Sequence, residues 1–219
     1  ALLLDEHWYM TPYYLGREGY PNQPRFHLRG VGITADDFVP GPLEDWTRGA
    51  LRLNGRDQYA LAANAPLNGP HAYTVVGAWA QQGQREERIA DGEDFRSPQV
   101  HTTSFLIEAV LMVAPGHVGG VVMEKRLPEV GYSLAVDDSG RMVFAIAGGG
   151  RQARVTSTVA VNTGEWLHVI AEADRQGPSL RLALNGRPDA VAPGLGRDVS
   201  LANPADLTVG GTPQGRCLA

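Results

Sequence analysis

The chain has 219 residues, of which 43% are hydrophobic and 20% charged, and its formal net charge is −5 at pH 7. This composition is typical of a folded globular chain and excludes a disordered one. The acidic balance, without any run rich in lysine or arginine, argues against a nucleic-acid partner, which needs a basic surface. No stretch of about 18 apolar residues occurs, so we expect no membrane span.

Glycine and proline are frequent along the whole chain, with 27 and 15 residues, which favours many turns and few helices. The length suits a single domain. Residues 1–48 differ from the rest, because aromatic and proline residues are scattered there without a sustained period. We expect an irregular arm whose aromatic side chains pack on the domain formed by residues 49–219. A sugar-stacking platform is the alternative interpretation of the arm.

Short apolar runs recur at even spacing through residues 49–219, as they do in an all-β sandwich. Residues 103–113 are apolar on both faces apart from Glu108, which predicts a central strand. The most charged stretch, residues 81–101, predicts a solvated loop, with a substrate loop as the alternative. A hairpin is expected over residues 48–62, and further strands at 72–80, 119–126, 130–136, 141–147, 153–158 and 206–211.

One stretch contains a strand, a break, a second strand and a tight turn. An apolar run at residues 165–173 ends at a Gln-Gly-Pro break, and residues 179–184 then alternate at period two. Asn185 and Gly186 follow, and this dipeptide tolerates the positive φ angles of a type I′ turn, so the chain should fold back on itself there. The same four residues, Leu-Asn-Gly-Arg, occur at 53–56 and predict the same turn.

Trp166 lies in a Gly-x-Trp-x-His-Val motif that is followed by Asp174 and by Leu-Arg-Leu-x-Leu-Asn-Gly-Arg. This pattern resembles the laminin-G-like modules of the concanavalin A-like jelly-roll superfamily. Residues 50–60, 131–134 and 139–144 resemble other strands of that family in the same order. The resemblance implies an all-β fold, a two-sheet antiparallel jelly-roll sandwich, with the irregular arm in front.

Members of that family usually continue past a Leu-Thr-Val-Gly-Gly strand into a further strand that closes the sheet. No matching segment follows residues 206–211 here. An uncovered sheet edge is an aggregation hazard. We therefore expect the domain to lack its closing strand, and another polypeptide or the remainder of a precursor to supply it.

Glycan-cleaving enzymes of the same superfamily share a Glu-x-Asp-x-x-Glu strand motif, in which two acids at i and i+2 lie on one face. The nearest match is Glu172 with Asp174, but the third position is Gly177, so the general acid is missing. The sequence also lacks a zinc-ligand spacing, a phosphate loop and a serine nucleophile elbow. We assign no catalytic residue, and keep Glu172 and Asp174 only as candidates.

Some laminin-G-like modules hold calcium in loops through carboxylate and carbonyl oxygens, and the resemblance makes Asp137 and Asp138 the candidate ligands here. No other cofactor is expected. His168 lies on a strand expected to be buried, which favours a hydrogen-bonded core histidine over a catalytic base. Cys217 is the only cysteine and predicts a free buried thiol, with a bond to residues outside the chain as the alternative.

The leading hypothesis is a non-catalytic binding or structural module that recognises glycan or protein. The resemblance places it in a larger secreted or periplasmic bacterial protein or complex. One alternative is a glycoside hydrolase or polysaccharide lyase of the same superfamily. The other is a subunit that supports a catalytic partner through an open sheet edge.

Overall fold

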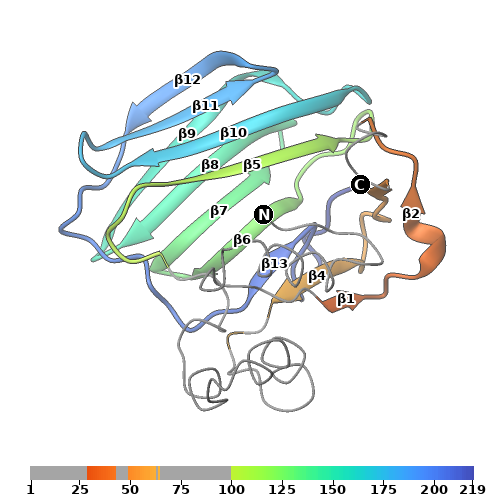
Figure 1. Cartoon of the computed structure of the whole chain (residues 1–219), viewed down its shortest axis with the longest axis horizontal. Helices are drawn as coiled ribbons and strands as arrows, with labels where there is room; N and C mark the ends of the chain where they lie inside the picture. The colour runs from red at the N-terminus through yellow and green to blue at the C-terminus, as the bar shows by residue number, and fades with distance from the viewer. Residues whose placement is uncertain (1–28, 43–48, 63, 65–99) are drawn as a thin grey trace, which may run out of the picture.

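The computed structural model describes residues 29–42, 49–62, 64 and 100–219, which form an antiparallel β-sandwich (Figure 1). Seven strands form a large sheet in the order β1-β4-β13-β6-β7-β8-β9, and four form a small sheet in the order β12-β11-β10-β5. A ribbon of two strands, β2 and β3, stands apart from both sheets. The predicted all-β, two-sheet antiparallel jelly-roll sandwich is confirmed.

The strands of the large sheet are β1 (Arg29–Val31), β4 (Tyr59–Ala62), β6 (Val121–Leu127), β7 (Val130–Val136), β8 (Arg141–Gly148), β9 (Arg151–Ala160) and β13 (Leu207–Val209). Those of the small sheet are β5 (Phe105–Met112), β10 (Trp166–Asp174), β11 (Ser179–Leu184) and β12 (Arg187–Pro193). The ribbon consists of β2 (Phe38–Val39) and β3 (Ala50–Leu51), with the short 3-10 helix η1 (Ala35–Asp37) just before it. No helix in the described residues is long and apolar enough to cross a lipid bilayer.

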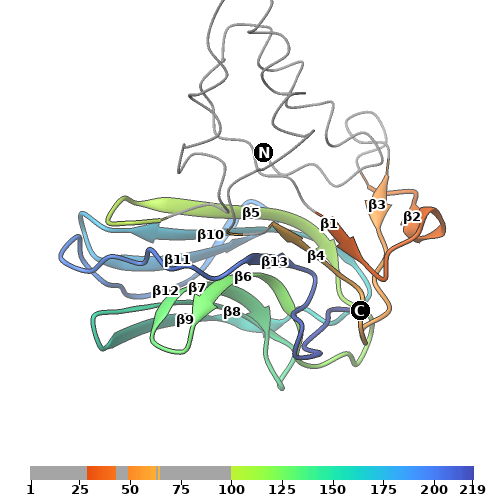
Figure 2. The same ribbon diagram turned by 90° about the horizontal axis from the view of Figure 1, so that it is seen from below.

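The core lies between the two sheets, which stack face to face (Figure 2). Leu134 and Phe144 of the large sheet and Val169 and Leu180 of the small sheet are completely buried there. At one side of the sandwich the two sheets meet, because β12 lies against β9 and Asp189 of β12 accepts hydrogen bonds from the backbone and hydroxyl of Thr158. Edge strands β9 and β12 therefore protect each other.

The tight turn after β11 forms as predicted. Asn185 has a φ of 51° and Gly186 a φ of 74°, which are the two positive angles of a type I′ turn. The side-chain oxygen of Asn185 also accepts a hydrogen bond of 2.9 Å from the backbone of His168 on β10. β11 and β12 consequently pair antiparallel across this turn.

The predicted hairpin over residues 48–62 is wrong. β3 pairs with β2, while β4 pairs with β1 and β13. The reason lies in the side chain of Asn54, whose oxygen accepts hydrogen bonds from the backbone of Arg56, Asp57 and Gln58 at 2.9, 3.2 and 3.4 Å. These bonds fix a wider loop in place of a two-residue turn, since asparagine competes well for nearby backbone amides.

The expected boundary between arm and domain at residue 48 also differs from the structure. β1 pairs with β4 in the large sheet, so residues 29–31 belong to the sandwich and are not irregular. The strand predicted at 72–80 and nearly all of the polar insertion at 81–101 lie outside the described residues, as do residues 1–28 with most of the aromatic side chains of the arm.

The long apolar strand predicted at 103–113 is β5, but its position in the sheet differs from the prediction. Among the described strands β5 pairs only with β10, so within the described part of the chain it is an edge strand of the small sheet and not the central strand that was expected. The sequence shows that β5 is apolar on both faces. Which strands lie beside it in the sheet depends on residues that are distant in the sequence. The supply of a closing strand by another polypeptide stays a prediction.

Replacing Gly186 by alanine tests the turn between β11 and β12. The left-handed backbone costs a residue with a Cβ atom about 1–2 kcal/mol, and no atom lies within 4 Å of the position that the new methyl group would take. Gly186→Ala should therefore lower the free energy of unfolding by about 1 kcal/mol. Urea denaturation measures this difference. The control is Gly177→Ala at the other turn of β11, where φ is not positive and the loss should be smaller.

Candidate functional site

The candidate site is the outer face of the small sheet, the side that points away from the large sheet. Side chains alternate along a strand, so the residues between the buried ones of β5 and β10 point to this face. The register aligns them in rows across the strands, with Met112 opposite Trp166, Val110 opposite His168 and Leu106 opposite Glu172. The outer face comprises Leu106, Glu108, Val110, Met112, Trp166, His168, Ile170, Glu172, Asp174, Arg181 and Val191.

Several large apolar side chains of the outer face are open to solvent. Leu106 is 59% exposed and Val191 70%, while Val110 and Met112 are 39% and 40% exposed. Trp166 and Ile170 are half-buried beside them. Single exposed apolar residues are normal on a protein surface, but several neighbouring ones, such as Leu106, Val110 and Met112 on β5, are typical of a binding surface.

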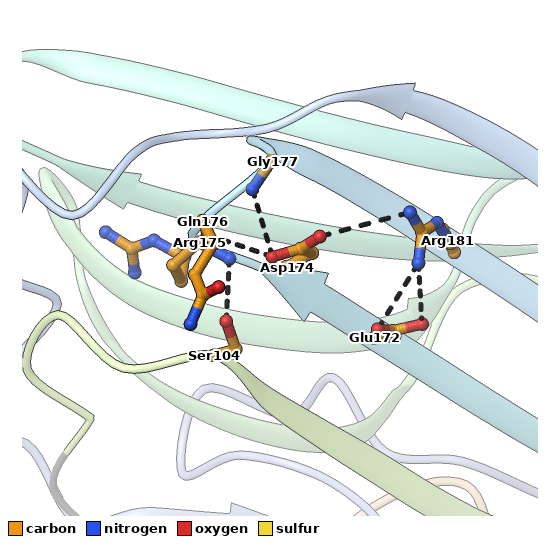
Figure 3. A network of polar contacts seen from close by, with 7 residues as sticks. All are labelled: Ser104, Glu172, Asp174, Arg175, Gln176, Gly177 and Arg181. Carbon is orange, nitrogen blue, oxygen red and sulfur yellow. Dashed lines mark hydrogen bonds and ion pairs between the residues drawn. The ribbon is translucent and has the colours of Figure 1, made fainter.

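Two groups of polar contacts lie among these apolar side chains. In the first, Nε2 of His168 is 2.7 Å from Oε1 of Glu108. In the second, Nη1 of Arg181 is 3.4 Å from Oε2 of Glu172 and Nη2 of Arg181 is 4.0 Å from Oδ2 of Asp174 (Figure 3). The prediction that His168 is a core histidine is wrong, because its neighbour Val169 takes the inward position and turns the imidazole outward. Exposed pairs of this kind add little stability, but they offer charged hydrogen-bonding groups to a ligand.

The structure brings the two candidate catalytic acids, Glu172 and Asp174, to the same face of β10, where both contact Arg181. Asp174 also accepts hydrogen bonds from the backbone of Gln176 at 2.9 Å and Gly177 at 3.2 Å, so it closes the turn between β10 and β11 (Figure 3). The amide of Gln176, then that of Gly177, lowers the pKa of Asp174. A carboxylate held ionised in this way is a poor proton donor, and no third acid stands at Gly177.

Asp137 and Asp138, the candidate calcium ligands, lie in the turn between β7 and β8. Oδ1 of Asp137 accepts hydrogen bonds from the backbone of Ser139 and Arg141 at 2.8 and 3.0 Å and from the Ser139 hydroxyl at 2.6 Å. This oxygen is therefore committed to the turn, while Asp138 is exposed. The described residues contain no group of three or more His, Cys, Asp or Glu side chains placed to bind one metal ion. Calcium binding stays a prediction.

A buried lysine, which the sequence did not reveal, anchors the large sheet. Lys125 of β6 is 0% exposed, and its ammonium donates hydrogen bonds to the side chain of Asn64 and the carbonyl of Ala205. Burial lowers the pKa of Lys125 from 10.5 to about 8, and the carboxylate of Asp206 opposes part of this shift. The ammonium ties the segment after β4 to the loop before β13.

A buried arginine anchors the loop between β12 and β13. Arg175 is 1% exposed, and its guanidinium donates hydrogen bonds to the carbonyls of Leu195, Gly196 and Val199. Burial lowers the pKa of Arg175, although Asp198 acts against this change. Because carbonyl oxygens carry only partial charge, the guanidinium works as a structural clamp on the loop.

The thiol of Cys217 is free and 3% exposed, as the favoured interpretation predicted. Its sulfur packs in the space beside Gly211, at the end of β13. Burial raises the pKa of Cys217, so the thiol stays protonated and unreactive at neutral pH. Cys217 is thus a core residue and not part of the candidate site.

Glu172 and Asp174 were predicted to share one face of a strand, but the outer face as a whole was not predicted. The sequence feature that indicates the outer face is the apolar run of β5, in which Leu106, Val110 and Met112 point outward. The sequence does not show which half of an apolar strand faces the core. That choice is made by pairing with β10, which places Ile107 and Leu111 inside.

Comparison with known proteins finds a laminin G family model, described as concanavalin A-like lectin/glucanases superfamily, that matches residues 54–218. No curated protein matches the chain. Among solved structures, domains LG4-5 of the mouse laminin alpha1 chain match with 15% identity and a TM-score of 0.42, over 53% of this chain and 33% of that one. The CBM40 of the IT-sialidase of Ruminococcus gnavus matches with 15% identity and a TM-score of 0.42, over 54% of this chain and 70% of that one. The same module bound to alpha2,3 sialyllactose matches with 15% identity and a TM-score of 0.41, over 55% of this chain and 69% of that one.

Acid denaturation tests the role of Asp174 in the turn. Its pKa is lower in the folded chain than its ordinary value of 3.8, so the stability that it contributes is complete above that value and is lost as the pH falls through the folded pKa. Asp174→Asn keeps an acceptor oxygen but cannot titrate. The urea midpoint should fall less between pH 5 and pH 2 in this variant than in the wild type. Asp138→Asn, at an exposed carboxylate, is the control and should behave like the wild type.

Alkaline titration tests Lys125. Because its pKa drops from 10.5 to about 8 on folding, the unfolded chain binds more protons between these values, and this group makes stability rise with pH. Burial raises the pKa of both Tyr132 and Cys217, and these two groups act in the opposite direction. The difference between Lys125→Met and the wild type isolates the lysine. The variant should lose the upward contribution between about pH 8 and pH 10, and parallel curves would contradict the assignment.

Proposed function

Since the chain belongs to the concanavalin A-like lectin/glucanases superfamily, we propose that it is a non-catalytic binding module whose ligand surface is the outer face of the small sheet. One observation carries the proposal: large apolar side chains of β5 are exposed there beside two sets of charged groups. Burial of the apolar side chains on binding provides affinity, and the charged groups provide specificity.

Binding is favoured over catalysis by the state of the acids. Glu172 is held by Arg181, and Asp174 is held by two backbone amides and Arg181. A retaining or inverting glycosidase needs one carboxyl group that carries a proton and a second that is free to act. The lowered pKa of Asp174 acts against the first requirement. The glycoside hydrolase or polysaccharide lyase remains the alternative function.

Protein is the ligand class that the outer face favours. Its exposed side chains Leu106, Val110, Met112 and Val191 are aliphatic or a thioether, and such side chains pack well against other apolar side chains but offer no flat ring to a sugar. Glycan is the second candidate, because Trp166 is half-buried opposite Met112 and lies two residues before His168, which points to the same face and contacts Glu108. A ring beside hydrogen-bonding groups can stack on the apolar side of a sugar.

The proposal extends to the setting of the module. We place it in the periplasm or outside the cell, as part of a larger protein or complex, in which it recognises a ligand or supports a catalytic partner. The family supports a binding role, and the exposed apolar surface supports a macromolecular partner. Fractionation of the native source locates the protein and identifies polypeptides that co-purify with it.

A binding experiment separates these classes. Purified protein is tested on a glycan array with and without calcium, and in glycan-cleavage assays. A protein-binding module should bind no glycan and cleave none. Glycan binding that Trp166→Ala reduces by about tenfold or more, the size expected for a buried aromatic contact, supports the second candidate, with Val159→Ala on β9 as the exposed control. Cleavage that Glu172→Gln abolishes supports the enzyme, and binding only with calcium supports the predicted metal.

A further inference from the structure

The position of β5 conflicts with its sequence. Strands that are apolar on both faces are typical of sheet interiors, where other elements cover them. β5 has this composition, with Glu108 as its one charged residue, yet among the described strands it pairs only with β10. Within the described residues its second edge therefore presents backbone N–H and C=O groups that have no strand beside them and need hydrogen-bond partners.

In the part of the chain that the structure describes, the other edges of the two sheets of the sandwich are protected, as is usual in natural proteins. β12 contains Pro188 and Pro193, which have no backbone N–H, and it is joined to β9 through Asp189 and Thr158. β1, at the far edge of the large sheet, has only three residues. β5 is eight residues long and contains neither proline nor lysine. It is thus the edge best suited to accept another strand.

The side chains next to this edge are incompletely covered on both faces. On the outer face Leu106 is 59% exposed and Val110 39%. On the inner face Phe105 and Ala109 point toward the core but are only partly buried. The ring of Phe105 lies 5.2 Å from that of Tyr132, which shows that it belongs to the core. A neighbouring strand would cover side chains on both faces at once.

The charge of the edge selects the kind of strand. Glu108 lies between Leu106 and Val110 on the outer face, where its carboxylate contacts Nε2 of His168 at 2.7 Å but its side chain is still 60% exposed and open to a second partner. Glu172 and Asp174 of the adjoining strand already contact Arg181 of β11. A basic residue opposite Glu108 is favourable. A second copy of this chain, paired antiparallel through the centre of β5, would bring the two Glu108 carboxylates close together, which is unfavourable.

Building on the proposed function, we propose that β5 binds an extended segment of a second polypeptide, which adds to the small sheet as a fifth strand. The segment carries apolar side chains next to Leu106 and Val110 and a lysine or arginine next to Glu108. Main-chain hydrogen bonds along β5 provide the affinity, and the alternating side chains provide the specificity, as in other cases of strand addition.

Amide hydrogen exchange of the full chain without ligand is the first test. Amides on the open edge of β5 should exchange faster than those of β10, which is paired on both sides, by on the order of tenfold or more. Equal protection along β5 and β10 would show that the chain itself covers this edge, and would overturn the proposal.

The second test uses two capped peptides of about nine residues, the length that matches β5. They alternate valine and threonine and differ only at the centre, which is lysine in one and glutamate in the other. The lysine peptide should bind the full chain and slow the exchange of β5 amides. Val110→Lys should weaken its binding by about tenfold or more, and Glu108→Lys should shift the preference to the glutamate peptide.

Val159→Lys is the control, because Val159 is 55% exposed but lies on β9 of the large sheet, outside the outer face. Its binding should equal that of the wild type, and circular dichroism checks that each variant is folded. Binding of neither peptide, or binding that Val110→Lys leaves unchanged, overturns the proposal. Self-association that Val110→Lys abolishes, measured by analytical ultracentrifugation, overturns it in favour of a second copy. Glycan binding to the outer face without peptide binding overturns the strand but leaves the proposed binding function intact.

Discussion

Burial of the inner face of β10 is the constraint on which both the fold and the candidate site depend. Val169, Ala171 and Ala173 of this strand are all 0% exposed. Ala173 lies opposite Phe105 of β5 in the register, and the ring of Phe105 packs against the rings of Tyr132 and Phe144 in the large sheet. The register of β10 thereby fixes the contact between the two sheets.

The same register creates the outer face. Because side chains alternate at period two, burial of Val169 and Ala171 turns His168 and Glu172 to the opposite side. A slip of one residue would move the charged set into the core, where unpaired charges are costly to bury. The alternation of side chains along β10 therefore produces both the charged groups of the outer face and the apolar core beneath it.

Two buried charges hold segments that the sheets alone do not fix. Lys125 contacts the segment after β4 and the loop before β13, and Arg175 clamps the loop that leaves β12. Burial of both charged groups costs desolvation free energy, and this cost lowers the pKa of Lys125 and of Arg175. Their many hydrogen-bond acceptors are carbonyl and amide oxygens, so these residues specify loop positions more than they add stability.

The sequence was sufficient for features that depend on neighbouring residues. The prediction of residues 130–136 coincides with β7, and the Asn185 turn forms as expected. Features that depend on distant partners were less accessible. The same tetrapeptide at 53–56 forms a loop because the Asn54 side chain captures three amides. The edge position of β5 could not be predicted, since an apolar strand of this kind is compatible with either place in a sheet. Burial of Lys125 was equally hidden, because only the folded loops around it provide its hydrogen-bond acceptors.

The single thiol, that of Cys217, can report on local opening of the fold. Cys217 packs beside Gly211, while its neighbours Arg216 and Leu218 hydrogen-bond through their backbones to Val121 of β6 and Gly210 at the end of β13. A thiol reagent can therefore reach the sulfur only after this corner of the large sheet opens. Under conditions where closing is faster than modification, the labelling rate follows the free energy of that local opening. The labelling rate of Cys217 therefore measures the local opening of this corner without any engineered probe.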